Sequence, residues 1–248
     1  MENYLTIAQI SDPHISPNDE FHYHIPVRQN FIGALKRLAQ KPLDLLVISG
    51  DLAATTGDKH VYQWIKHTLT DFPHPYVIMS GNHDDVQNIA HVFDAQKEDV
   101  HNNQLYFRRF IKNQLLLFLD STNYTVPIEQ LQWLQQQVAN HPHEALLFIH
   151  HPPLLCGCAF MDNQHSLQNI EATWQTLSQL PSINHIFCGH YHTERTLYQQ
   201  GKHIYLAPST MLQIDTEQPD FAVEHTVPGW RMIEWCPGEL RTYTEYLW

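Results

Sequence analysis

Apolar runs of strand length recur between residues 5 and 188, and they are rich in Val, Ile, Leu and Phe. Runs of this near-continuous hydrophobic kind are typical of strands that are buried on both faces of a sheet. The predicted strands are Leu5 to Ile10, Leu43 to Ser49, Tyr76 to Ser80, Leu115 to Asp120, Ala145 to His150 and His185 to Cys188.

Between these runs the apolar positions change to helical spacing, as in Val61, Trp64, Ile65 and Leu69. Strand and helix in alternation indicate βαβ units and a largely parallel sheet. The predicted helices are Val27 to Ala39, Lys59 to Leu69, Asp85 to Phe93, Ile128 to Val138 and Leu167 to Leu180.

After about Thr193 the pattern changes to short strands separated by Gly and Pro, which predicts a meander of antiparallel strands. Two packed sheets with helices outside would hold both halves in one domain, so we expect an α/β (α+β) fold and a single domain over residues 1–248. The predicted late strands are Thr196 to Gln199, His203 to Ala207, Phe221 to His225, Trp230 to Glu234 and Leu240 to Tyr246.

Metal-type donors follow the ends of five of the early runs. Ligands bind at the carboxyl ends of strands in open α/β sheets, so these residues are predicted to converge on one rim. Residues two apart in a strand point to the same side, which would aim each Asp-x-His or His-x-His pair at one site. Gly50, Gly81 and Gly189 allow tight departures and close backbone approach. The candidate ligands are Asp12, His14, Asp51, Asn82, His150, His190 and His192.

This mixture of oxygen and imidazole donors suits two ions that share one carboxylate. Divalent Mn or Fe is expected, with Zn as an alternative, whereas Ca²⁺ prefers oxygen alone. Each motif by itself is weak, because an Asp-x-His or Gly-Asp pair is usually turn chemistry. Five such motifs in one order are much harder to assign to chance. Among the other histidines, His151 is expected behind its neighbour His150, and His22 and His24 are candidates for the mouth of the site.

The 26 acidic and 14 basic residues give a net charge of -12, which argues against nucleic acid or an anionic membrane as a partner. A phosphate-bearing substrate would therefore need local positive charge. The sequence shows neither a signal peptide nor a transmembrane run, which favours a soluble, cytoplasmic protein. Its four cysteines are too few for a disulfide framework and are expected to be reduced thiols.

These motifs resemble the calcineurin-like metallophosphoesterase superfamily, whose fold is a β-sandwich flanked by helices in four α/β/β/α layers. The resemblance implies that Asp51 bridges two ions and that a hydroxide between them attacks phosphorus. It further implies His83 as the general acid and Asp84 as a residue that orients it, with Asn82, His83 and His192 facing the substrate. One ion would be held by Asp12, His14, Asp51 and His192, and the other by Asp51, Asn82, His150 and His190.

Segments outside the metal motifs resemble the class III cyclic nucleotide phosphodiesterases, namely Gln164-His165-Ser166-Leu167, Pro208-Ser209-Thr210 and Pro228-Gly229-Trp230-Arg231. After Gly50-Asp51 the chain lacks the arginine of serine/threonine phosphatases and the tyrosine of purple acid phosphatases. The resemblance implies hydrolysis of a small-molecule cyclic nucleotide, 3',5'-cyclic AMP, to 5'-AMP. The alternatives are a broader diesterase acting on 2',3'-cyclic nucleotides or other small diesters, and a non-catalytic metal-binding scaffold. The sequence leaves the oligomeric state open. The insertion Leu154 to Leu167 is expected either to cover the base or ribose as a lid or to pack on its own side chains.

Overall fold

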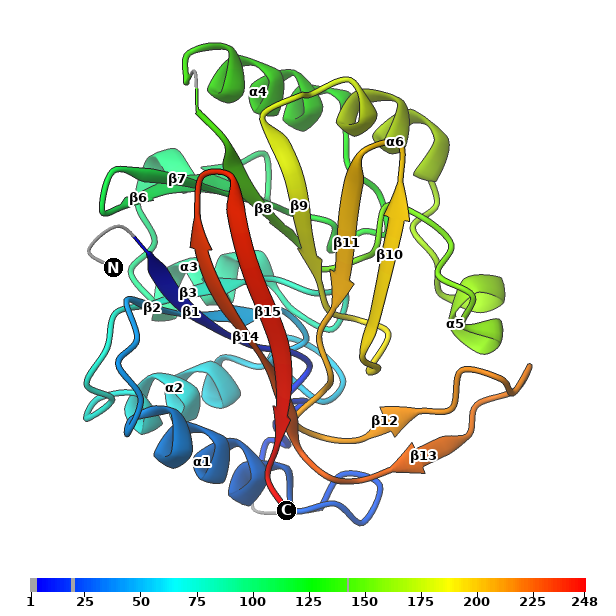
Figure 1. Cartoon of the computed structure of the whole chain (residues 1–248). Coiled ribbons are helices and arrows are strands. Elements are labelled where there is room, and N and C mark those ends of the chain that lie inside the picture. The colour runs from blue at the N-terminus through cyan, green and yellow to red at the C-terminus, as the bar shows by residue number, and fades with distance from the viewer. Residues whose placement is uncertain (1–3, 19–20, 142) are drawn as a thin grey trace.

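The computed structural model of the protein describes residues 4–18, 21–141 and 143–248. Two mixed sheets pack face to face, and helices cover their outer sides (Figure 1). The first sheet has the order β15-β14-β1-β2-β3, and the second has the order β10-β11-β9-β8-β7-β6. The predicted α/β fold class is therefore confirmed.

The first sheet consists of β1 (Leu5–Ile10), β2 (Leu45–Ser49), β3 (Tyr76–Met79), β14 (Gly229–Cys236) and β15 (Glu239–Tyr246). The second consists of β6 (Phe107–Ile111), β7 (Gln114–Leu119), β8 (Ala145–Ile149), β9 (Ile183–Cys188), β10 (Arg195–Gln199) and β11 (Lys202–Leu206). Two short pairs complete the strands, β4 (Val100–His101) with β5 (Gln104–Leu105) and β12 (Gln213–Ile214) with β13 (Val223–His225).

Helices α1 (Val27–Leu38) and α2 (Lys59–Thr68) lie outside the first sheet, and α4 (Ile128–Ala139) and α6 (Ile170–Ser178) lie outside the second (Figure 1). The remaining helices are α3 (Val86–Val92), the short α5 (Ala159–Gln164) and a 3₁₀ turn at Lys97–Asp99. None of the helices within the described residues has the length and apolar character that a membrane crossing requires.

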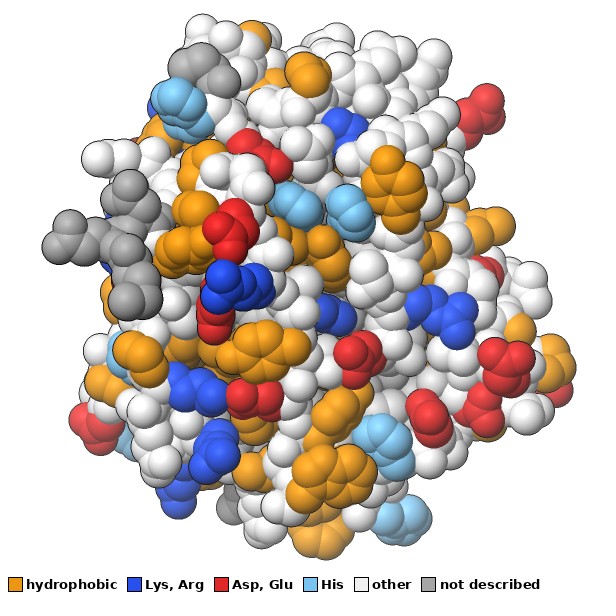
Figure 2. All heavy atoms as spheres, viewed as in Figure 1, with side chains coloured by type: hydrophobic (Ala, Val, Ile, Leu, Met, Phe, Trp, Pro, Cys, Tyr) orange, Lys and Arg blue, Asp and Glu red, His pale blue; other side chains and the backbone are white. Residues whose placement is uncertain are grey.

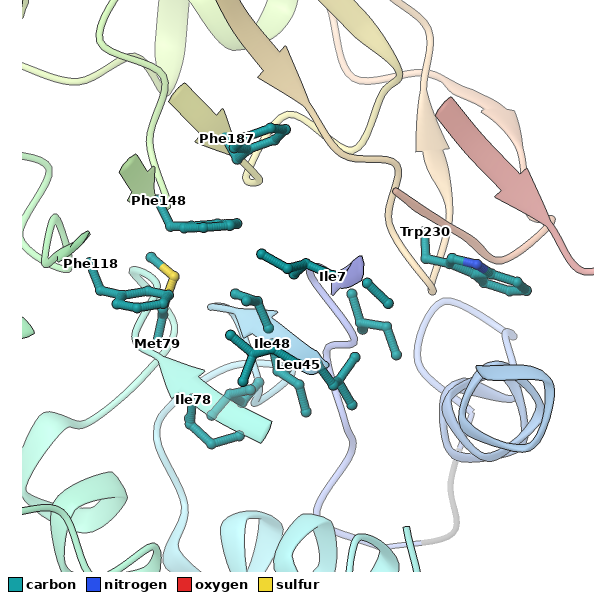
Figure 3. Packing of buried hydrophobic residues seen from close by; sticks show 14 of the residues in the cluster. Ile7, Leu45, Ile48, Ile78, Met79, Phe118, Phe148, Phe187 and Trp230 are labelled. Atoms are coloured by element: carbon teal, nitrogen blue, oxygen red, sulfur yellow. The ribbon is translucent and has the colours of Figure 1, made fainter. Parts of the chain in front are cut away.

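The continuous apolar runs are explained by burial on both faces. In β7, Leu116 and Phe118 belong to the core between the sheets, while Leu115, Leu117 and Leu119 belong to the core beneath α4 and α6. Alternate side chains of one strand thus enter two different cores, as the pleat requires. Between the sheets the rings of Phe118, Phe148 and Phe187 follow one another at centroid distances of 5.2 Å (Figure 3).

The later strands differ from the predicted antiparallel meander. In the second sheet, β11 pairs antiparallel with β10 but parallel with β9. β14 belongs to the first sheet, where it pairs antiparallel with β1. The prediction was wrong on β11 because short-range turn signals do not report which distant strand is its second neighbour. The edge strand β6, with its exposed Arg108 and Phe110, was also missed.

Acidic and basic side chains are interspersed over the face of the molecule shown in Figure 2. All four cysteines are free, as expected, and Cys156, Cys158 and Cys188 are buried.

Candidate metal centre

The seven predicted donors meet at the carboxyl ends of the parallel strands of both sheets. Two groups of titratable side chains have ligand atoms within 4.8 Å of one another: Asp12 with His14 and His192, and Asp51 with His150 and His190. A third group joins His14 and Asp51 to His83. Residues as far apart in the sequence as His14 and His192 are thus brought together by strands of the two packed sheets.

Asp51 belongs to the group with His150 and His190 and also lies close to the other group. Its Oδ2 is 3.4 Å from Nε2 of His150 and 3.7 Å from Nε2 of His14. On the other side, Oδ1 of Asp12 is 3.4 Å from Nε2 of His192. Asp51 is therefore placed to contact ions held by either group.

The buried polar atoms of this site fit cations. Oδ1 of Asn82, Nε2 of His150 and Nδ1 of His190 are buried and have no hydrogen-bond partner among the described residues. Nε2 of His14 lies only 3.0 Å from Nε2 of His192, and Nδ1 of His14 is buried without a hydrogen-bond partner among the described residues. Buried donors of this kind are costly unless paired, and a divalent ion accepts lone pairs from all of them.

Backbone carbonyl groups orient three of the four imidazole ligands. Nδ1 of His150 lies 2.8 Å from the Ser49 oxygen, and Nδ1 of His192 lies 3.2 Å from the Leu212 oxygen. Because a carbonyl can only accept, Nδ1 of each of these two rings carries a proton, and Nε2 is the nitrogen left to bind a metal ion. His190 is reversed, since its Nε2 lies 2.9 Å from the His165 oxygen and its Nδ1 faces the site.

The backbone at the site is strained. Left-handed φ angles between 42° and 67° occur at Asp12, His14, Asp51, His190 and His192. Each such angle at a non-glycine residue costs of order 1–3 kcal/mol, although Asp and His tolerate it better than most residues. The Asp12/His14 and His190/His192 pairs therefore converge through left-handed turns beyond the strand ends. The prediction that they converge because residues two apart in a strand point to the same side was wrong.

Glycines at two strand ends admit the ligand side chains. Gly50 has a φ of 100°, and a Cβ there would lie 2.5 Å from Nδ1 of His150. A Cβ on Gly81 would lie 2.3 Å from Oδ1 of Asp51. The predicted role of these glycines in close approach is confirmed, since any larger residue would displace a candidate ligand.

Burial and mutual attraction set the charges of the ligands. Burial lowers the pKa of both His14 and His190 to about 3, so both present neutral imidazoles at neutral pH. Burial also acts against ionisation of Asp51, but attraction to His150 and His14 holds its pKa well below the ordinary value. For His150 burial is outweighed by attraction to Asp51, which raises its pKa to about 9.

His83 lies beside the centre. Its backbone N–H donates to Oδ1 of Asp51 over 2.9 Å, and its ring contacts that of His14 edge to face with centroids 4.9 Å apart. Nδ1 of the ring lies 3.0 Å from the carbonyl oxygen of Ala54. The imidazole is thus fixed by a carbonyl acceptor, with Nε2 left for another partner.

Asp84 does not make the expected contact with the His83 ring. Its carboxylate accepts hydrogen bonds from the backbone N–H groups of Leu52, Ala53 and Gly81 and from the Tyr62 hydroxyl. Burial, with repulsion from Asp51, raises the pKa of Asp84 to about 7. Asp84 therefore organises the loops after β2 and β3. The sequence offered no indication of its bond from Tyr62, nor of the contact between His83 and Ala54.

A pocket of about 480 Å³ opens directly onto the centre. Asp51, Asn82, His83 and His192 reach it, as does His22, one of two histidines considered for the mouth. His24 is not among its lining residues. His151 is buried behind the centre, with Nδ1 2.8 Å from the Ser121 hydroxyl oxygen.

The insertion between β8 and β9 forms one wall of the pocket. Asp162 accepts hydrogen bonds from the N–H groups of Cys156, Gly157 and Cys158 and from the Tyr191 hydroxyl. The same segment supplies pocket-lining side chains, including Phe160. The insertion thus packs on its own side chains and also lines the pocket, while its contact with a base or ribose stays a prediction.

Comparison with known proteins agrees with this geometry. The sequence model of the calcineurin-like phosphoesterase family matches residues 5–194, and the chain belongs to this family. A dimetal phosphatase from Danio rerio shares the fold with a TM-score of 0.66 at 15% identity, covering 97% of this chain and 98% of that one.

Curated relatives are similar over almost their whole length. A probable cyclic nucleotide phosphodiesterase from Fibrobacter succinogenes is 43% identical, covering 96% of this chain and 92% of the relative. The 3',5'-cyclic adenosine monophosphate phosphodiesterase CpdA of Escherichia coli is 31% identical, covering 94% and 86%. A probable glycerophosphodiester phosphodiesterase GpdQ from Arcobacter nitrofigilis is 27% identical, covering 98% and 93%. The predicted metal-dependent phosphoesterase enzyme is thereby confirmed.

Proposed function

We propose that this protein hydrolyses 3',5'-cyclic AMP to 5'-AMP at a centre of two divalent metal ions. The observation that carries the proposal is a pair of adjacent ligand groups, one of which contains Asp51 within 3.7 Å of His14 of the other, with His83 fixed beside them. The names of the relatives from Fibrobacter succinogenes and Escherichia coli, at 43% and 31% identity, support a cyclic nucleotide as the substrate.

Asp12, His14, Asp51 and His192 would hold one ion, and Asp51, Asn82, His150 and His190 the other. When bound, the two ions supply positive charge for the phosphate oxygens and lower the pKa of a coordinated water toward neutrality. The ligands contribute two carboxylate charges against four metal charges. No Lys or Arg is among the described residues that line the pocket, so this excess fits a singly charged diester.

His83 supplies the proton that the leaving group needs. His83 acts in its imidazolium form, in which Nδ1–H donates to the Ala54 carbonyl and Nε2–H is left for the leaving oxygen. In the proposed reaction a water gives up one proton to solvent and its oxygen bonds to phosphorus, the bond from phosphorus to the 3' oxygen breaks, and Nε2–H of His83 protonates that oxygen. The His83 amide donates to Asp51, which fixes the proton donor beside a candidate metal ligand.

The experiment is a hydrolysis panel after chelation and re-addition of Mn²⁺, Fe²⁺ or Zn²⁺ singly. We expect metal-dependent conversion of 3',5'-cyclic AMP to 5'-AMP, with 2',3'-cyclic AMP and glycerophosphodiesters turned over less efficiently. If only the latter substrates react, the broader diesterase function, which the relative named GpdQ favours, replaces this proposal. If no diester reacts with any metal, the non-catalytic scaffold is the better description.

A further inference from the structure

Five aromatic rings form a continuous path around the mouth of the pocket. The path begins at the candidate ligand His14 and ends at the candidate ligand His190, and all of its rings line the pocket. Successive ring centroids are 4.8–6.5 Å apart, which is the range of direct aromatic contact. In order, the five rings are those of His22, Tyr23, Phe221, Phe160 and His165.

The three carbocyclic rings come from segments far apart in the sequence. Tyr23 precedes α1, Phe160 is in α5, and Phe221 lies between β12 and β13, whose hairpin extends below α5 in Figure 1. Tyr23 is 64% exposed and Phe221 is 43% exposed, and they contact each other with centroids 5.9 Å apart. Exposed aromatic side chains gathered at a pocket mouth indicate a binding surface.

The chemistry of the wall defines the ligand. Met161, Met211, Leu212 and Ile214 add apolar surface, and the single acidic residue among the described lining residues is Asp51 at the metal end. At the outer end of the pocket, no lining side chain among the described residues would neutralise a charged group of the ligand, whether anionic or cationic. A flat, uncharged and polarisable group is the best complement to this surface.

We infer that this aromatic rim, Tyr23, Phe160 and Phe221, stacks against the nucleobase of the substrate while its phosphate lies at the metal centre. The inference rests on the proposed function and deepens it, because it names the residues that separate nucleotides from other diesters. Adjacent centroids only 5.8 and 5.9 Å apart leave no gap for a trimethylammonium group between the rings, so a choline headgroup fits less well.

The test compares binding of 5'-AMP and ribose 5-phosphate to the metal-loaded protein by calorimetry. The two probes share the phosphate and ribose and differ in the base. Base stacking on an aromatic residue is worth roughly 5- to 150-fold in affinity, so we expect 5'-AMP to bind more tightly by a factor in this range. Phe221→Ala and Tyr23→Ala should reduce this preference several-fold while leaving the affinity for ribose 5-phosphate unchanged.

Phe221→Trp should retain the preference, because an indole also offers a stacking face. Tyr198→Ala is the matched control, since Tyr198 is 68% exposed on β10 and is not part of the rim. Equal affinity for the two probes in the unmodified protein, or Phe221→Ala and Tyr23→Ala variants that keep its preference, would overturn the inference. Turnover of 3',5'-cyclic AMP measured in parallel tests the proposed function separately. An active enzyme without a preference for 5'-AMP would contradict base stacking on the aromatic rim but not the proposed function.

Discussion

The Nε2 atom of His190 donates a hydrogen bond to the carbonyl oxygen of His165, 2.9 Å away. One candidate metal ligand is therefore oriented by the end of the insertion that walls the pocket. Tyr191, the next residue, is bonded to Asp162 in the same insertion. The shape of the pocket and the orientation of the centre are consequently linked through two neighbouring residues.

Asp162→Ala tests this linkage. Three backbone N–H groups and the Tyr191 hydroxyl lose their acceptor, so we expect the wall to loosen and kcat/KM for the cyclic nucleotide to fall about tenfold, which corresponds to about 1.4 kcal/mol. Asp94→Ala is the control, because Asp94 forms an exposed ion pair with Lys66. Steady-state kinetics would contradict the linkage if both variants behaved like the unmodified protein.

Asp51→Ala and Asn82→Ala should abolish turnover while leaving the fold intact. Asp51 belongs to the group with His150 and His190 and lies 3.7 Å from His14 of the other group, so under the proposed ligand sets its loss should reduce bound metal below one ion per chain, whereas loss of Asn82 should weaken one ion. Elemental analysis and circular dichroism measure the two properties. A fully active variant at either position would count strongly against the dinuclear centre.

His83→Asn separates a proton donor from a ligand. General acid catalysis typically contributes 10²- to 10⁴-fold, so turnover of 3',5'-cyclic AMP should fall by about that factor. An aryl diester whose leaving group needs no proton should be affected far less. Unchanged metal content is also expected, and a variant that loses metal would instead make His83 a ligand, as its proximity to His14 and Asp51 permits.

The metal-free protein should lose stability as the pH rises from 6.5 toward 9. The pKa of His150 is raised from 6.5 to about 9 by Asp51, so protonation of His150 stabilises the folded chain fully below pH 6.5 and this stabilisation is lost by about pH 9. Bound metal replaces that proton and should remove the loss. Melting curves recorded with chelator or with Mn²⁺ across this pH range measure the loss of stability. In His150→Gln the loss should be smaller. A loss equal to that of the unmodified protein would mean that groups other than His150 cause it.

The sequence predicts the centre better than its surroundings. Each donor follows an apolar run, and strand ends of the parallel set meet at one rim, so Asp51 and His150 could be placed together without coordinates. The left-handed turn at Asp12 and the carbonyl contact of His83 depend on backbone conformation, which residue types do not reveal. Phe221 carried no signal because it approaches Tyr23 only through tertiary packing. The single-domain organisation stays a prediction.

The absence of Lys and Arg among the described residues lining the pocket has a physiological corollary. An enzyme that recognises an anion through its own guanidinium or ammonium groups binds that anion whether or not its metal is present. Here the apoprotein would offer an incoming nucleotide little electrostatic attraction, so the affinity for substrate as well as the chemical step would follow the supply of metal in the cell.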